Sequence, residues 1–177
     1  MKLGVMCSGS GTNFENIVRT CRYDEVVLMI YNKKDCGAAK RAAKLGIPSC
    51  YVNSKDEPKI VREFVWAGVE LVVMAGWMRI VTSHLIDVFP NRIINIHPSL
   101  LPKHKGLNVV QRAMDAGDKV TGCTVHYVTE ELDSGDIIIQ REVPILPDDT
   151  VESLTRAIQR LEYSILPEAI EYVKQRV

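Results

Sequence analysis

The sequence predicts an α/β fold built on a doubly wound, mostly parallel sheet with helices on both faces. Short apolar segments alternate with helix-like segments along the 177 residues, and this alternation is typical of such folds. Residues 26–31 are apolar without interruption, as expected of a parallel strand that is buried on both faces. The length of the chain and its lack of repeats and linkers favour one domain that spans residues 1–177.

Each element is predicted from hydrophobic periodicity and from the residues that end helices. Strands are expected at residues 3–6, 26–31, 49–52 and 71–75, and at the apolar run that carries Asn95 and His97. Helices are expected at residues 13–21, 38–45, 59–66, 83–88 and 109–116. Later strands are expected at 122–128 and 137–143, as candidates for antiparallel additions. A last helix is expected to begin at Asp149-Thr150 and to run to the C-terminus, with Pro167 as a candidate bend.

The composition excludes several classes of protein. The 22 basic and 22 acidic residues give no net charge, so we expect no nucleic-acid partner. No apolar run is long enough to span a membrane, and the first residues do not resemble a secretory signal, so a cytoplasmic protein is expected. The five cysteines form no C-x-x-C pair, which favours free thiols over disulfides or a metal site.

The most informative motif is the strand that ends in Asn95-Ile96-His97-Pro98. Side chains two residues apart on a strand point to the same face, so an amide and an imidazole share one face of this strand end. Pro98 ends the strand, and ligands of open α/β sheets bind at the carboxyl ends of the strands. A neutral donor beside a titratable base suits a reaction that passes through an oxyanion. The alternative is a core histidine with a backbone partner.

Two further segments have weaker patterns. The loop 8–13, Ser-Gly-Ser-Gly-Thr-Asn, joins the first strand to the first helix, and a helix N-terminus behind a glycine-rich loop suits a phosphate. One alternative is that the loop is only a tight turn. Another is that Thr12 and Asn13 are plain helix caps. The acidic segment 130–136 is either a solvated hairpin turn or a source of a carboxylate, Asp133 or Asp136, that approaches His97 and raises its pKa.

Taken together, five motifs in register resemble the phosphoribosylglycinamide formyltransferase family, folate-dependent enzymes of purine synthesis, over nearly the whole chain. The motifs are the loop 8–13, Met74-Ala75-Gly76-Trp77-Met78-Arg79-Ile80, the run 95–102 from Asn95 to Pro102, Thr121-Gly122-Cys123-Thr124-Val125-His126, and Leu132-Asp133-Ser134-Gly135.

The resemblance implies transfer of the formyl group of 10-formyltetrahydrofolate, a co-substrate, to the amine of glycinamide ribonucleotide, with no metal. It implies a catalytic trio formed by Asn95, His97 and Asp133. The ribonucleotide would be held by Gly11, Thr12, Asn13 and Glu162. The folate would lie against Met78, Arg79, Ile80, Thr129, Glu130, Glu131, Leu132 and Asp133. The partners implied are these two small molecules, and a monomer or a homodimer is expected.

The sequence departs from the family pattern at a few positions. His104-Lys105 replaces an aromatic-Pro pair, and Tyr163 stands where a histidine is usual. A substrate-contacting arginine of the family has at best Lys55 in its place, and the chain ends soon after the last helix. Alternative functions are formyl transfer to another amine, such as that of an amino sugar nucleotide, hydrolysis of formyl-folate, and non-catalytic binding of folate or a nucleotide.

Overall fold

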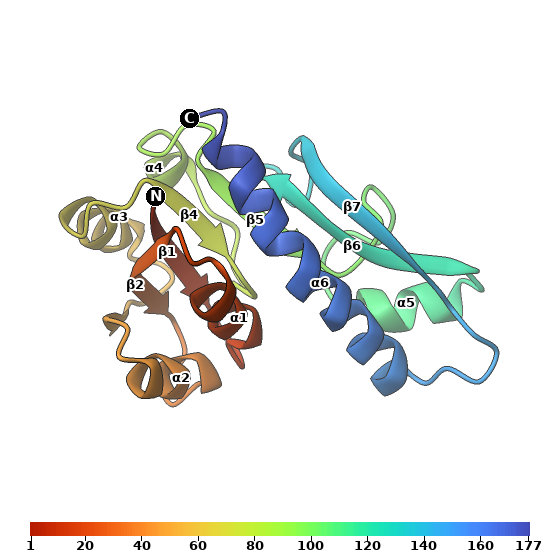
Figure 1. Ribbon diagram of the computed structural model, residues 1–177. Coiled ribbons are helices and arrows are strands. Elements are labelled where there is room, and N and C mark those ends of the chain that lie inside the picture. The colour runs from red at the N-terminus through yellow and green to blue at the C-terminus, as the bar shows by residue number, and fades with distance from the viewer. The chain divides into compact units, whose positions relative to one another are not determined.

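The structure is a computed structural model that describes residues 1–177. It divides into two compact units, Met1–Asn95 and Ile96–Val177, and the elements of each are labelled in Figure 1. The seven strands follow the order β3-β2-β1-β4-β5-β6-β7. This is the mixed sheet, mostly parallel and flanked by helices, that the sequence predicts.

The first unit contains the parallel part of the sheet. Its elements are β1 (Lys2–Cys7), α1 (Thr12–Thr20), β2 (Glu25–Tyr31), α2 (Gly37–Leu45), β3 (Ser49–Tyr51), α3 (Glu57–Trp66), β4 (Leu71–Met74) and α4 (Ser83–Ile86). The next strand, β5 (Ile93–His97), crosses from the first unit into the second. Strands β1 to β5 pair in parallel, so their carboxyl ends lie along one edge.

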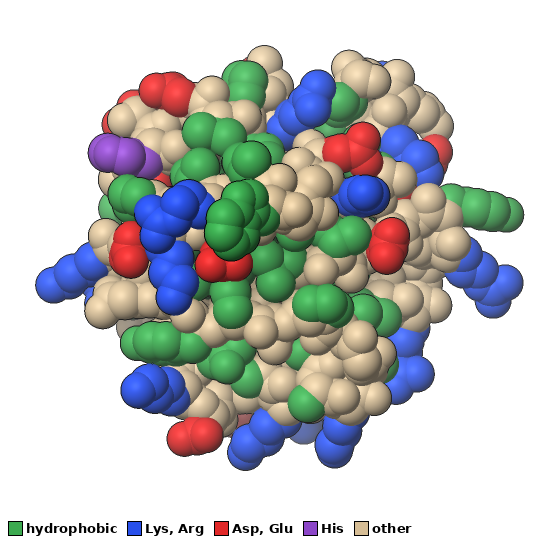
Figure 2. Space-filling model, turned by 90° about the vertical axis from the view of Figure 1, so that its left-hand side faces the viewer, with side chains coloured by type: hydrophobic (Ala, Val, Ile, Leu, Met, Phe, Trp, Pro, Cys, Tyr) green, Lys and Arg blue, Asp and Glu red, His purple; other side chains and the backbone are tan.

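The core of the first unit is built from continuous apolar strands. All four residues of β4 are buried, as expected for a strand covered on both faces. Phe14 of α1 and Phe64 of α3 are fully buried, and each such side chain contributes about 1.5–3 kcal/mol when it leaves water. At the surface, Figure 2 shows hydrophobic side chains interspersed with charged ones on the face that it presents. Trp66, with 86% of its surface exposed, is the largest of the exposed apolar side chains.

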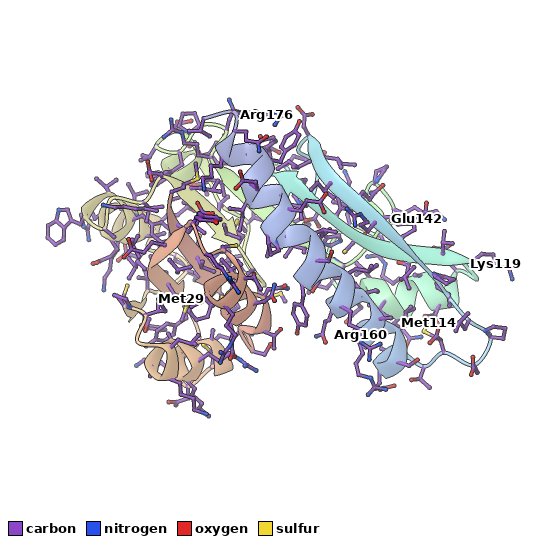
Figure 3. The ribbon with its side chains drawn as sticks, in the orientation of Figure 1. Met29, Met114, Lys119, Glu142, Arg160 and Arg176 are labelled. Carbon is purple, nitrogen blue, oxygen red and sulfur yellow. The ribbon has the colours of Figure 1, made fainter.

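The second unit contains α5 (Val109–Asp115), β6 (Val120–Tyr127), β7 (Ile137–Pro144) and α6 (Val151–Lys174). Strand β7 is antiparallel to β6, which confirms that a late strand is an antiparallel addition. The long helix α6 packs on both strands and on α5, and Figure 1 shows α6 running alongside the β6–β7 pair. Exposed Glu142 of β7 and Arg160 of α6 are labelled in Figure 3, as is Met29 in the core of the first unit.

The predicted elements are all present, and their ends differ by three residues or fewer. The largest difference is at α6, which ends at Lys174 and not at the C-terminus. Helix α3 begins at Glu57 because the Asp56 side chain accepts a hydrogen bond from the Lys59 N–H, 3.2 Å away, and so caps the helix. Thr150 caps α6 as predicted, in a reciprocal pair of hydrogen bonds with Ser153. Pro167 lies within the continuous helix α6.

Candidate active site

Strand β5 presents Asn95 and His97 as the sequence predicts. Val73 and Met74 of β4 pair in parallel with Ile94 and Asn95 of β5, so Asn95 lies beside the carboxyl end of β4. Ile94 is fully buried on the opposite face. His97 is the last residue of the strand, with 6% of its surface exposed. The amide and the imidazole therefore follow one another along the same face at the end of the strand.

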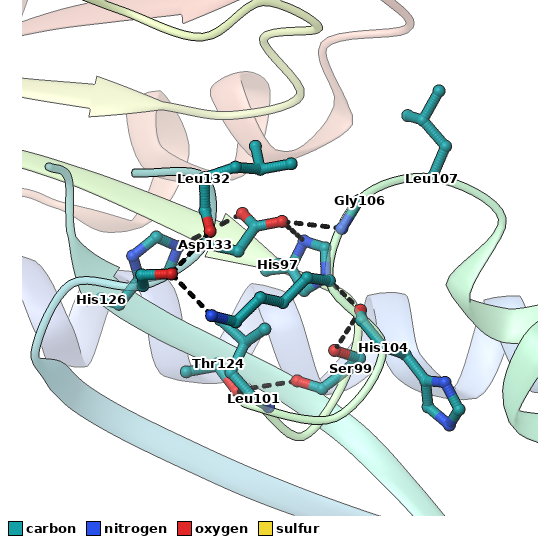
Figure 4. Close-up of polar contacts among 12 residues, drawn as sticks. His97, Ser99, Leu101, His104, Gly106, Leu107, Thr124, His126, Leu132 and Asp133 are labelled. Carbon is teal, nitrogen blue, oxygen red and sulfur yellow. Dashed lines mark hydrogen bonds and ion pairs between the residues drawn. The ribbon is translucent and has the colours of Figure 1, made fainter. Parts of the chain in front are cut away.

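Both ring nitrogens of His97 have partners. Nε2 lies 2.9 Å from the main-chain oxygen of His104, which can only accept a hydrogen bond, so Nε2 carries a proton. Nδ1 lies 3.6 Å from Oδ2 of Asp133, as the close-up in Figure 4 shows. Nδ1 is therefore the nitrogen that faces the carboxylate. The alternative of a core histidine with a backbone partner accounts for the contact of Nε2 but not for the carboxylate that faces Nδ1.

Asp133 reaches His97 from the loop between β6 and β7. Its Oδ2 atom accepts a hydrogen bond from the Gly106 N–H at 2.9 Å, and Oδ1 lies 3.8 Å from Nε2 of His126. Only 6% of the side chain is exposed. The solvated-turn interpretation is thus wrong for Asp133, and the predicted approach of a carboxylate to His97 is confirmed. Asp136 is exposed, and it is its main-chain oxygen that accepts a hydrogen bond, from the Tyr127 N–H.

Gly135 explains why this loop takes its shape. A Cβ at this position would lie 1.7 Å from the main-chain oxygen of Tyr127, so any other residue would push the loop away from β6. Ser134 tightens the same turn by donating to the Leu132 oxygen at 2.8 Å. Asp133 itself has a φ of 49°, a conformation that aspartate adopts more readily than most residues. The Leu-Asp-Ser-Gly motif therefore sets the position of the carboxylate.

His126 lies beside Asp133 and His97 in the site. It was not among the site residues predicted from the sequence. Only 2% of its surface is exposed, and Nδ1 lies 2.9 Å from the Tyr127 oxygen. Burial is the main cause that lowers the pKa of His126 below 6.5, with a smaller contribution from His97, while the Tyr127 oxygen and Asp133 oppose the shift. Alternation along the strand places Thr124 and His126 on one face, and that was the signal that could have identified it.

Thr124 ties the segment after His97 to the late strands. Its Oγ1 donates to the Ser99 oxygen at 2.7 Å and accepts from the Leu101 N–H at 3.2 Å. The Gln140 amide of β7 donates to Thr124 Oγ1 and to the Leu101 oxygen, both at 2.9 Å. These hydrogen bonds replace the strand pairing that ends at Pro98. They hold the segment 99–101, which leads into the part of the loop that carries His104 and Gly106.

In the first unit, Ser8 joins two of the predicted ligand-binding segments. Its Oγ accepts a hydrogen bond from the Met78 N–H at 2.9 Å, and its N–H donates to the Gly76 oxygen at 2.9 Å. The loop 8–13 and the segment 78–80 therefore lie side by side at the carboxyl edge of β1 and β4. Met78, Arg79 and Ile80 are exposed, whereas Trp77 is buried.

The glycine-rich loop leads directly into α1. Gly11 precedes the helix with a φ of 75° and no side-chain cap, so the interpretation of Thr12 and Asn13 as helix caps is wrong. A Cβ on Gly11 would lie 2.6 Å from Cα of Ala38, which brings the loop close to the start of α2. Thr12 and Asn13 form the first turn of α1, where main-chain N–H groups have no partner within the helix.

The remaining predicted residues lie in the second unit. Glu162 is buried on α6, with 7% of its surface exposed. Burial raises the pKa of Cys123 on β6 to about 12, and the charge of Glu162 contributes to this shift. Thr129, Glu130, Glu131 and Leu132 are exposed in the loop that carries Asp133.

The cysteines are all free thiols, as the sequence predicts. Burial, with a smaller contribution from Cys36, raises the pKa of Cys7 far above its usual range, so this thiol is not a nucleophile. No three or more His, Cys, Asp or Glu side chains are grouped as metal ligands. None of the helices combines the length and the apolar composition that a membrane span needs.

The chain has relatives among known proteins. Residues 1–170 match the formyl transferase family. The chain belongs to this family. A phosphoribosylglycinamide formyltransferase from Haemophilus influenzae is 37% identical over 97% of this chain and 86% of its own length.

Two further comparisons extend this result. The trifunctional purine biosynthetic protein adenosine-3 of Drosophila melanogaster is 39% identical over 96% of the chain, and the chain spans only 14% of that longer protein. The crystal structure of glycinamide ribonucleotide transformylase 1 from Symbiobacterium toebii is similar, with a TM-score of 0.95, 39% identity, and coverage of 99% of this chain and 89% of the other. The predicted family and fold are thereby confirmed.

Proposed function

We propose that this formyltransferase transfers the formyl group of 10-formyltetrahydrofolate to the amine of glycinamide ribonucleotide, giving formylglycinamide ribonucleotide and tetrahydrofolate. The observation that carries the proposal is the His97 imidazole, with Nδ1 facing the buried Asp133 carboxylate and with Asn95 preceding it on the same face of β5. The names of the full-length relative from Haemophilus influenzae and of the Symbiobacterium toebii structure support the choice of acceptor.

The chemistry requires an oxyanion to be stabilised and a proton to be moved. The substrate amine attacks the formyl carbon, and the carbonyl oxygen of the formyl group becomes an oxyanion. The Asn95 amide and the protonated His97 ring donate hydrogen bonds to this oxygen. The bond between the formyl carbon and the folate nitrogen then breaks, the folate nitrogen takes up a proton, and the amine loses one.

In this mechanism Asp133 has two tasks. Its negative charge, 3.6 Å from Nδ1, pairs with the His97 ring while the ring donates to the oxyanion. It also accepts the proton of the amine, through a water molecule, and passes it on to the folate nitrogen. The Gly106 N–H, at 2.9 Å from Oδ2, keeps the carboxylate oriented while this happens.

The binding residues are assigned by the same proposal. The phosphate of the ribonucleotide lies on Gly11, Thr12 and Asn13 at the N-terminus of α1, where the positive end of the helix dipole favours an anion. Glu162 accepts hydrogen bonds from the ribose hydroxyls. The folate lies against the exposed segment 78–80 and the loop 129–133. These sets contact the two substrates within one formyltransferase domain, residues 1–177, and the protein acts in the cytoplasm as a monomer or a homodimer.

The test is an assay of tetrahydrofolate release with and without glycinamide ribonucleotide. We expect release only when the ribonucleotide is present. Release without the ribonucleotide would indicate hydrolysis of formyl-folate. Release that an amino sugar nucleotide supports better than the ribonucleotide would indicate another acceptor, and binding of both ligands without release would indicate a binding protein.

A further inference from the structure

The main chain of His104 contacts the central histidine. The His104 oxygen accepts the hydrogen bond of His97 Nε2 at 2.9 Å. Because a carbonyl oxygen can only accept, this contact requires the tautomer of His97 that keeps its proton on Nε2. The tautomer is fixed in this way only while the His104 oxygen stays where it is.

The main chain of His104 has a conformation that needs support. Its φ is 55°, in the left-handed region that is uncommon for residues other than glycine. The oxygen also accepts a weaker hydrogen bond from Ser99 Oγ at 3.1 Å. Ser99 Oγ has a closer acceptor in the Lys103 oxygen, at 2.7 Å, so this serine alone does not fix the His104 oxygen.

The side chain of His104 supplies the missing support. Its Nε2 atom lies 2.7 Å from Oδ2 of Asp118, and the side chains are only 16% and 11% exposed. Asp118 is fixed in turn, since its N–H donates to the Ala113 oxygen of α5 at 3.1 Å. The hydrogen bond from His104 is the largest of the causes that lower the pKa of Asp118, so the carboxylate is charged.

We propose that the His104 side chain and Asp118 form a positioning pair that holds the His104 oxygen in place and thereby fixes the tautomer and the orientation of His97. This inference rests on the proposed function for its effect on turnover, but not for its effect on the ring of His97. Neither residue of the pair is among those that we assign to the substrates.

Lys103 provides a matched control. Its Nζ donates to the other oxygen of Asp118 at 3.0 Å, and 65% of its side chain is exposed. Lys103→Ala therefore removes a charge and a hydrogen bond from the same carboxylate but leaves the contact with His104. A surface ion pair of this kind contributes little by itself.

The experiment combines nitrogen NMR of the His97 ring with steady-state kinetics. In the unliganded parent, above the pH at which His97 loses its charge, we expect Nε2 protonated and Nδ1 unprotonated. In His104→Phe and Asp118→Ala we expect averaged ring signals, roughly a tenfold lower kcat, and KM values for both substrates within about twofold. Lys103→Ala should keep the parent's signals and a kcat within about twofold.

Three results would overturn the proposal. A parent whose His97 carries its proton on Nδ1, or on both nitrogens in exchange, excludes it without any variant. Parent-like ring signals in a folded His104→Phe or Asp118→Ala would exclude it as well. An equal loss of kcat in Lys103→Ala and Asp118→Ala would assign the effect to charge alone. Since the ring signals need no substrate, a parent without transferase activity would contradict the proposed function but leave this test standing.

Discussion

Oδ2 of Asp133 lies 3.6 Å from Nδ1 of His97 and also accepts the Gly106 N–H at 2.9 Å. Both groups are therefore held by the main chain of the loop 98–108. The Gly106 N–H holds the carboxylate, and the His104 oxygen holds the imidazole ring. The loop 98–108 thus sets both the tautomer of the imidazole and the place of its counter-charge.

Asp133→Asn should lower kcat by about tenfold or more. The amide oxygen can still accept the Gly106 N–H, but the negative charge that faces His97 and the group that accepts the proton of the amine are lost. Asp136→Asn, at an exposed position of the same turn, is the control. A kcat of Asp133→Asn within a few-fold of the parent and of Asp136→Asn would contradict the role of Asp133.

Thr12→Val should raise KM for glycinamide ribonucleotide several-fold and leave KM for the folate unchanged. The substitution keeps the shape of the side chain and removes a hydroxyl from the first turn of α1, where we place the phosphate. Gly11 is unsuitable for this test because a Cβ would lie 2.6 Å from Cα of Ala38 and would disturb the fold. Thr20→Val at the other end of α1 is the control. Equal weakening of both substrates would count against a phosphate site here.

His126 should titrate below pH 6.5, because burial disfavours its charged form. Below about pH 6.5 the unfolded chain then binds more protons at His126 than the folded protein does. The free energy of unfolding should therefore fall as the pH drops below about 6.5. His126→Asn should remove this part of the pH dependence. Proton NMR of the ring and urea unfolding between about pH 7 and pH 5 test both statements. A midpoint at or above 6.5 would show that the Tyr127 oxygen and Asp133 together outweigh burial.

Trp77 should report the binding of folate. It is 7% exposed and adjoins the segment 78–80, whose Met78 N–H bonds to Ser8. Trp66 lies on α3 with 86% of its surface exposed, and Trp66→Phe removes its emission. We expect a folate analogue to change the emission of the Trp66→Phe variant. Unchanged emission at saturation, with binding verified by calorimetry, would place the folate elsewhere.

The sequence predicted those features that depend on residue spacing. Asn95 and His97 share a face because the period of a strand is two residues, and Thr150 caps α6 by its own side chain. What depends on the path of a loop could not be predicted. The oxygen that meets His97 comes from His104 in a left-handed conformation, and no pattern of side chains indicates where a main-chain oxygen will lie.

Similar reasons explain the other differences. His126 reaches Asp133 only because the loop after β6 folds back, and Gly135 allows that fold by its lack of a Cβ. The choice between Asp133 and Asp136 was open for the same reason, since both lie in one turn and only the turn's geometry separates them. The family resemblance supplied Asp133, and the structure gives the physical cause.

The central claim is most directly tested by following the formyl carbon. The parent and His97→Ala are incubated with 10-formyltetrahydrofolate labelled at the formyl carbon and with glycinamide ribonucleotide, and the product is identified by mass spectrometry. From the parent we predict labelled formylglycinamide ribonucleotide in an amount equal to that of the tetrahydrofolate released. We predict at least a hundredfold less from His97→Ala, since acid–base and oxyanion contributions are each worth about that much. Label recovered as formate, or His97→Ala within a few-fold of the parent, would contradict the account.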